Sequence, residues 1–266
     1  MTVTIVTGSS RGLGQSIAKL IITNSPSSKV VLAARSKQQL ETFPNLFPEE
    51  SRNDVLKRSL IVPGDLNDKD SIEKLIEKTV SKFGRIDSIV FNAGVLEPVD
   101  HIIDVDVDQM KKLFDINFFS VIKLLQLAIP HLRESAKERG TPSSCIFVSS
   151  GASIRTIDGW LGYGASKSAL NHLAMDLSIE EAPLIRSISV APGVVDTEMQ
   201  RTIREEAGKK MKPDQLKRFT DLYEKGELLP ADVPGEVYAR LALGGISEGL
   251  NGRYMRYNSD ELSKGE

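Results

Sequence analysis

The chain has 266 residues, of which 40% are hydrophobic, and a formal net charge of −2. This length fits one large α/β domain or two small ones, with enough apolar residues for a substantial core. The nearly neutral charge excludes the strongly basic character of proteins that bind nucleic acid or anionic membranes.

The reactive and metal-ligating residues are few. The only cysteine, Cys145, lies in an apolar run, so we expect a buried thiol and no disulfide. His101, His131 and His172 lack the spacing of metal ligands, so we expect no metal. A strand pattern begins almost at Met1 and no apolar run reaches ~18 residues, so we expect neither a signal peptide nor a membrane span. These features indicate a soluble, cytoplasmic protein.

Strand and helix patterns alternate along the chain. The expected strands are residues 3–6, 29–34, 59–62, 86–91, 144–148 and 187–190, with a candidate seventh at 252–255. One expected helix follows the first strand, and another begins at Asp70 and is capped by Asp70 or Ser71. Residues 108–133 are expected to form one long helical stretch or two helices, and further helices are expected at residues 160–179 and 234–243. This order predicts one doubly wound Rossmann domain over residues 1–266, a parallel sheet of about seven strands with helices on both faces.

Residues 197–229 interrupt the alternation after the sixth strand. The segment is charged and helical in character. It follows the carboxyl end of a strand, where open α/β sheets bind ligands, so we interpret it as a lid over the substrate. The alternative is a helical excursion that is simply solvated.

A glycine-rich turn, TGSSRGLG at residues 7–14, follows the first strand. Glycines allow tight curvature and close approach to a diphosphate, and the next helix offers free N–H groups. The alternative is an ordinary glycine-rich connection. The expected diphosphate-binding residues are Gly8, Ser10, Arg11, Gly12, Leu13 and Gly14.

The end of the second strand indicates which cofactor binds. NAD-binding folds place an acidic residue ~20 residues after the glycines, to hold the ribose 2′-hydroxyl. Here that position holds Ala34 and Arg35. Arg35, helped by Arg11, suits a 2′-phosphate because a guanidinium matches phosphate oxygens. We therefore expect NADP(H), although each arginine alone could be a surface residue.

Tyr163 and Lys167 lie four residues apart, on one face of the predicted helix. A tyrosine has a pKa of ~10, and a lysine beside it would lower that value and make it a proton donor near neutral pH. Ser149 and Ser150 end the preceding strand, where alternation allows only one to face the cleft.

These motifs together resemble the short-chain dehydrogenase/reductase family. The resemblance rests on TGSSRGLG, Asn92-Ala93-Gly94, Asn117, Ser150, Tyr163-x-x-x-Lys167 and Pro192-Gly193-x-Val195-x-Thr197. More narrowly, SSGAS, the GW before the tyrosine, LNHLAMD and APGVVDTEMQ are similar to segments of fungal benzil reductases forming (S)-benzoin and, more distantly, of sepiapterin reductases. Phe91 departs from the family, which often has a second asparagine there.

The resemblance implies a role for each matching residue. Tyr163 would donate the proton, Lys167 would also bind the nicotinamide ribose, Ser150 rather than Ser149 would hold the substrate oxygen, and Asn117 would hold a water of the proton path. The alternative for Asn117 is an ordinary helix residue. Further cofactor contacts are implied for Asp65, Leu66, Asn92, Ala93, Gly94, Pro192, Val195 and Thr197.

The expected activity is NADPH-dependent reduction of a carbonyl, in a homodimer. The substrate residues would be Ser150, Trp160 and Met199, although core packing explains Trp160 equally well. An apolar pocket with few charges would favour one carbonyl of an aryl 1,2-diketone, such as benzil, giving (S)-benzoin. Its expected lining is Gly151, Ala152, Trp160, Met199, Ile203, Phe219, Leu222 and Tyr223. Alternatives are a pterin reductase, a general aldehyde or ketone reductase, and a non-enzymatic NADP(H)-binding regulator.

Overall fold

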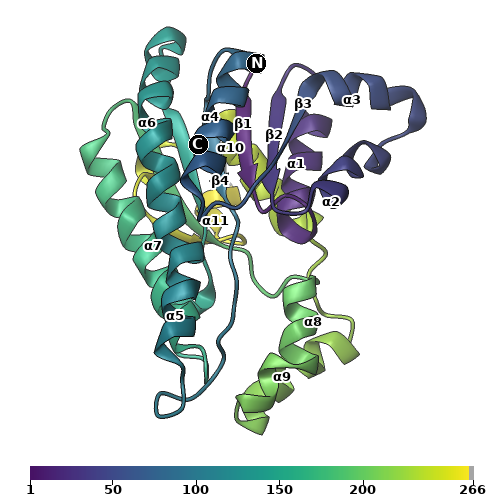
Figure 1. Ribbon diagram of the computed structural model, residues 1–266, viewed down its shortest axis with the longest axis vertical. Helices are drawn as coiled ribbons and strands as arrows, with labels where there is room; N and C mark the ends of the chain where they lie inside the picture. Colours follow the sequence, from purple (N-terminus) through teal and green to yellow (C-terminus); the bar gives the residue numbers. More distant parts are fainter. Residues whose placement is uncertain (264–266) are drawn as a thin grey trace.

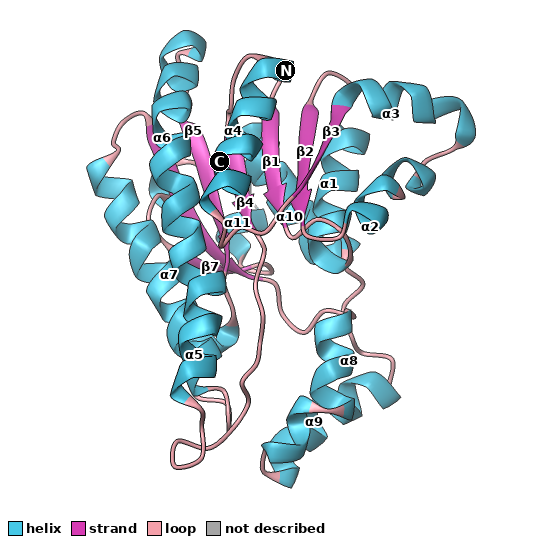
Figure 2. Cartoon of the chain, in the orientation of Figure 1, coloured by secondary structure: helices cyan, strands magenta, loops and turns pink. Residues whose placement is uncertain are grey.

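The computed structural model describes residues 1–263, which form a seven-stranded parallel sheet with helices around it (Figure 2). The strand order is β3-β2-β1-β4-β5-β6-β7. The bounds are β1 Val3–Thr7, β2 Lys29–Ala34, β3 Ser59–Pro63, β4 Ser88–Phe91, β5 Ser143–Val148, β6 Ile185–Ala191 and β7 Tyr254–Arg256. The predicted doubly wound Rossmann fold is confirmed.

The central strands are buried along their whole length because helices cover both faces of the sheet. Successive side chains alternate between the faces: Ile5 packs in one core and Val6 in the other. Helices α1 (Gly12–Asn24) and α10 (Asp232–Gly244) cover the Val6 face (Figure 1). Helices α4 (Lys69–Phe83), α6 (Ser120–Arg139) and α7 (Leu161–Glu180) cover the Ile5 face.

One local prediction was wrong, and one connection contains helices that were not foreseen. Helix α4 is capped by Asp68, whose carboxylate accepts from the Ser71 N–H at 3.1 Å, and not by Asp70 or Ser71. The connection between β2 and β3 contains two helices that the sequence did not indicate, α2 (Lys37–Glu41) and α3 (Arg52–Arg58). Both are short, so they contain too few turns to show a helical period. The last element within the described residues is a short helix, α11 (Asp260–Ser263).

The expected helical stretch at 108–133 is longer and interrupted. Helix α5 (Val107–Phe114) continues through a π-helical turn (Asp115–Phe119) into α6. By length and composition the whole stretch is apolar enough to cross a membrane, contrary to the sequence-based expectation. However, Leu124, Ala128 and Leu132 are buried against the sheet, as in the core helix of a globular domain.

The segment after β6 forms a helical insertion, residues 197–229, containing α8 (Glu198–Glu205) and α9 (Pro213–Glu224). Figure 1 shows both helices extending away from the sheet at the bottom of the view. Its two ends meet in a bridge between Val195 and Leu229, where the Leu229 N–H donates to Val194 at 3.0 Å. The chain therefore leaves the sheet and its covering helices and returns to them at the same place.

Candidate active site

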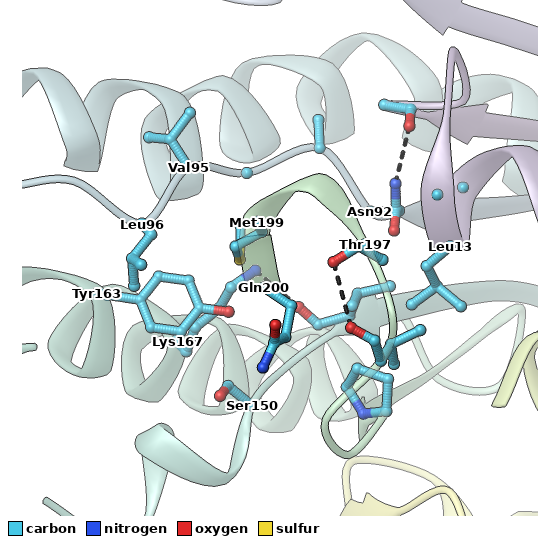
Figure 3. Close-up of a pocket in the computed structure, with 18 of the residues that line it drawn as sticks. Leu13, Asn92, Val95, Leu96, Ser150, Tyr163, Lys167, Thr197, Met199 and Gln200 are labelled. Atoms are coloured by element: carbon cyan, nitrogen blue, oxygen red, sulfur yellow. Dashed lines mark hydrogen bonds between the residues drawn. The ribbon is translucent and has the colours of Figure 1, made fainter. Parts of the chain in front are cut away.

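A cavity of about 980 Å³ lies at the carboxyl ends of the strands. It runs from the glycine turn and Arg35 to Tyr163, and helix α8 brings Met199 to the same end (Figure 3). Of the candidate site residues from the sequence, all line this cavity except Asn117 and Tyr223. The structure therefore gathers motifs from many separate segments of the chain around one space.

The glycine turn has no room for larger side chains. Gly8 has a φ of +64°, and a Cβ on Gly14 would lie 2.4 Å from both the Gly8 oxygen and Asn92 Nδ2. Asn92 holds the turn by donating from Nδ2 to the oxygens of Thr7 at 2.9 Å and Gly8 at 3.1 Å. Helix α1 begins beside it at Gly12, and no side chain caps its first N–H groups. These features fit a bound diphosphate.

Two arginines line the end of the cavity that is away from Tyr163. Arg11 and Arg35 both line it and are exposed to solvent. Neither forms an ion pair with any residue in the described range 1–263. These two guanidinium groups, one in the glycine turn and one directly after β2, fit the 2′-phosphate of NADP(H).

Tyr163 and Lys167 lie one turn apart on α7, and only 7% and 3% of their respective surfaces are exposed. Lys167 Nζ lies 5.7 Å from the centre of the Tyr163 ring. It donates a hydrogen bond of 2.8 Å to the Val148 oxygen at the end of β5. The amine is thus fixed beside the phenol (Figure 3).

Burial dominates the pKa values of both groups. It raises the pKa of Tyr163 to about 12, which an interaction with the Ser150 side chain opposes. Burial also lowers the pKa of Lys167 to about 8. The expected lowering of the Tyr163 pKa by Lys167 does not occur in this structure, because burial raises that pKa and the interaction that opposes the rise is with Ser150 and not with Lys167. Tyr163 therefore keeps its proton at neutral pH.

The two serines after β5 have different partners. The Ser149 hydroxyl is buried and donates to Asn171 Oδ1 at 2.6 Å. The Ser150 hydroxyl accepts from the Ala152 N–H at 3.1 Å and interacts with Tyr163. Both residues line the cavity, but only the Ser150 hydroxyl is next to the tyrosine.

Asn117 lies outside the cavity wall, in the π-helical turn. Its side chain is fully buried, accepting from the Val95 N–H at 2.8 Å and donating to the Val95 oxygen at 2.8 Å and to Ser166 Oγ at 3.1 Å. The amide thus holds Val95, which does line the cavity. With its amide groups engaged, Asn117 is a positioning residue for this wall.

The substrate end has an aromatic wall. Trp160 stacks on Phe219 of α9 at 5.4 Å between ring centres and meets Tyr163 edge-on at 5.5 Å. Met199, Ile203 and Leu222 also line this end. Tyr223 was expected here but lies outside the cavity, 55% exposed and packed against Arg204.

The expectation of few charges at this end is wrong. Arg155, Arg218 and Arg256 line the same cavity. Sequence reasoning missed them because they belong to three distant segments with no shared motif. Their convergence depends on where the helical insertion and β7 lie in the fold.

The remaining sequence features carry no chemistry here. Cys145 is fully buried, which raises the pKa of its thiol well above the ordinary value. Phe91 is buried and stacks on Phe147 at 4.8 Å, as an apolar strand end requires.

One group of potential metal ligands does occur, which the sequence did not indicate. Ligand atoms of Asp100, His101 and Asp104 lie within 4.8 Å of one another. Asp100 pairs with Lys210 at 3.2 Å, and His101 contacts Asp158 at 3.2 Å. These contacts account for two of the three side chains as links between loops.

Comparison with known proteins places this geometry in a family. The model of the short chain dehydrogenases matches residues 2–208. Benzil reductase ((S)-benzoin forming) of Saccharomyces cerevisiae is 41% identical over 266 residues, covering 98% of this chain and 97% of that protein.

Solved structures agree. The KRED1-Pglu enzyme is 50% identical, with a TM-score of 0.88 over 96% of this chain and 100% of its own. A cytoplasmic protein of unknown function from Saccharomyces cerevisiae is 40% identical, with a TM-score of 0.80 over 100% of this chain and 99% of its own.

Proposed function

The chain belongs to the short-chain dehydrogenase family, and on this premise we propose that it is an NADPH-dependent carbonyl reductase acting on one carbonyl of a small 1,2-diketone. The observation that carries the proposal is the arrangement of Tyr163, Lys167 and Ser150 at one end of the cavity, with free arginines at the other. Family membership makes the protein an oxidoreductase that uses a nicotinamide cofactor.

The residues present fit NADP(H). Arg11 and Arg35 would hold the 2′-phosphate, and the glycine turn would hold the diphosphate. Lys167 would bind the nicotinamide ribose. Other parts of the cofactor would contact Asp65, Leu66, Asn92, Ala93, Gly94, Pro192, Val195 and Thr197. When bound, the cofactor supplies a hydride.

The chain's own residues handle the proton. Ser150 donates a hydrogen bond to the substrate carbonyl oxygen and keeps it near Tyr163. Tyr163 gives its proton to the oxygen as negative charge develops there. The Lys167 cation then stabilises the phenolate that remains, inside a site with little water. Asn117 keeps Val95 in place through its hydrogen bonds. By resemblance to the family, Asn117 would also hold a water of the proton path.

The aromatic wall supports an aryl 1,2-diketone such as benzil, with (S)-benzoin as product. Trp160 and Phe219 offer flat apolar area, and one oxygen at a time fits between Ser150 and Tyr163. The 41% identical yeast relative named benzil reductase supports the same substrate. Pterin and general aldehyde or ketone reduction are the alternatives. A purely regulatory NADP(H)-binding role would leave the tyrosine acid without a purpose.

We extend the proposal to organisation and location. The predicted single domain over residues 1–266 stays part of the proposal, of which residues 264–266 lie outside the described residues, and the helical insertion acts as a lid because Met199 and Phe219 line the substrate end. The protein is cytoplasmic, as its 40% identical yeast relative is described. It forms a homodimer through α5 and the π-helical turn that follows it, where Val107 and Phe119 leave 60% and 46% of their surfaces exposed beside an apolar hollow. Analytical ultracentrifugation tests the dimer.

The direct test is NADPH oxidation with benzil, sepiapterin and simple aldehydes, followed by chiral analysis of the benzil product. The proposal expects benzil to be reduced once and to one enantiomer. Turnover of sepiapterin alone would favour a pterin reductase. NADPH binding without turnover of any carbonyl would favour the regulatory role.

A further inference from the structure

Three arginines from separate segments face the substrate end of the cavity. Arg155 follows the short helical turn Gly151–Ser153, Arg218 lies on α9, and Arg256 ends β7. All three are exposed. None makes a side-chain hydrogen bond or an ion pair with another residue of the described chain, in contrast to Arg253, which pairs with Glu261 at 2.6 Å.

The three guanidinium groups are close enough to repel one another. The pKa of Arg218 is lowered, most by burial and then by the positive charges of Arg155 and Arg256. No carboxylate opposes this effect on Arg218 within the described residues. The acidic residues that line the cavity are Asp65, Glu97, Glu198 and Glu227, and within the described residues none of them forms an ion pair with these three arginines. The cluster is therefore an uncompensated patch of positive charge.

The cluster adjoins the candidate catalytic serine. A Cβ on Gly151, the residue after Ser150, would lie 3.2 Å from Arg155 Nη2. Tyr254 donates to the Ser150 oxygen at 3.4 Å. Burial raises the pKa of Tyr254, while a hydrogen bond with Ser153 and the charges of Arg256 and Arg155 oppose that rise. Arg155 thus lies beside Gly151, and the charges of Arg155 and Arg256 both act on Tyr254, whose hydroxyl contacts the Ser150 backbone.

We propose that the carbonyl substrate carries an anionic group, a carboxylate or a phosphate, which Arg155, Arg218 and Arg256 bind while its carbonyl lies between Ser150 and Tyr163. Guanidinium groups match both oxyanions with paired hydrogen bonds. An anion would also relieve the repulsion among three like charges. Arg218 is on the helical insertion, so the anion would connect the insertion to the body.

The inference rests on the proposed reductase function, so the experiment uses substrates matched in shape. Benzoylformate and 1-phenylpropane-1,2-dione differ in a carboxylate in place of an acetyl group. Dihydroxyacetone phosphate and dihydroxyacetone form the phosphate pair. We expect the anionic member of one pair to have a kcat/KM at least about tenfold higher than its neutral partner at low salt. The pair that shows this preference identifies the oxyanion, and added salt should reduce it.

Arg218→Gln, Arg155→Gln and Arg256→Gln should each reduce kcat/KM for the anionic member about tenfold, mainly through KM, and leave the neutral member within about twofold. Arg253→Gln is the matched control and should change neither. Calorimetric titration of the NADP⁺-saturated protein with benzoylformate and with dihydroxyacetone phosphate gives a readout independent of turnover, and the same variants should weaken the binding.

Two results would overturn the inference while leaving the reductase function intact. One is equal or better turnover of the neutral member in both pairs. The other is an equal loss for both members in the arginine variants. Absence of turnover with every carbonyl, in a protein that still binds NADPH, would instead refute the reductase function. Calorimetry would then decide the anion site by itself: no heat of binding with either anion would refute it.

Discussion

Lys167 Nζ donates a 2.8 Å hydrogen bond to the backbone oxygen of Val148, the last residue of β5. This bond ties the helix that carries Tyr163 to the strand that leads into Ser150. The candidate acid, the cation and the substrate-binding hydroxyl therefore belong to one rigid unit. Because the same burial lowers the pKa of Lys167 to about 8 and raises that of Tyr163 to about 12, the two groups titrate in separate pH ranges.

The pH dependence of reduction should follow Lys167. The reaction needs the cationic amine and the protonated phenol. The amine is charged below its pKa of about 8, whereas the phenol stays protonated up to about 12. We expect kcat/KM for a neutral diketone to be level in mild acid and to fall as the pH rises through about 8. A profile that stays level well above this pH would contradict the assignment.

Arg35→Asp should shift the cofactor preference from NADPH towards NADH. A carboxylate there would repel a 2′-phosphate and accept from a 2′-hydroxyl. We expect the ratio of the kcat/KM values for the two cofactors to change at least about tenfold, or ~1.4 kcal/mol. Lys37→Asp is the control, because Lys37 pairs with Glu41 and does not line the cavity. An unchanged ratio in Arg35→Asp would mean that other residues bind the 2′-phosphate.

Gly14→Ala should abolish tight binding of NADPH. The added methyl group would lie 2.4 Å from the Gly8 oxygen and from Asn92 Nδ2, so the turn must open. Gly244→Ala is the matched control, since nothing lies within 4 Å of a Cβ there. Titration of NADPH fluorescence measures both variants. Parent-like affinity in a folded Gly14→Ala protein would show that the turn does not bind the cofactor.

Phe219→Leu should weaken diketone binding while leaving the chemistry intact. The change keeps an apolar side chain but removes the stacking on Trp160. An aromatic pair of this kind contributes about 0.5–1.5 kcal/mol beyond the area that it buries. We expect KM for benzil to rise about two- to tenfold with little change in kcat. Tyr223→Leu, outside the cavity, should have no such effect. Equal KM values in both variants would remove Phe219 from the substrate wall.

Much of the fold could be predicted because buried parallel strands give continuous apolar runs. Strand β2 was placed at its observed bounds for this reason. Helices α2 and α3 were missed because each buries few side chains, Leu40 in one and Val55 and Arg58 in the other. A period cannot be detected from so few positions.

The candidate site was predictable where a motif follows the end of a strand. The carboxyl ends of parallel strands meet at one edge, so the glycine turn, Asn92 and Ser150 had to converge. Two features depend on the folded structure itself. The pKa of Tyr163 is set by burial, which a spacing of four residues does not reveal. The arginine cluster forms only because Arg218 of the insertion lines the same cavity as Arg155 and Arg256.

The central claim is that Tyr163 is the proton donor of a carbonyl reductase. The most direct measurement is the single-turnover rate of Tyr163→Phe with saturating NADPH and benzil, together with its affinity for NADPH. The substitution removes only the hydroxyl and keeps the ring that packs against Trp160. The account predicts a rate about 10²–10⁴-fold lower than the parent rate, with NADPH affinity nearly unchanged. A rate within about tenfold of the parent, at the same affinity, would contradict it.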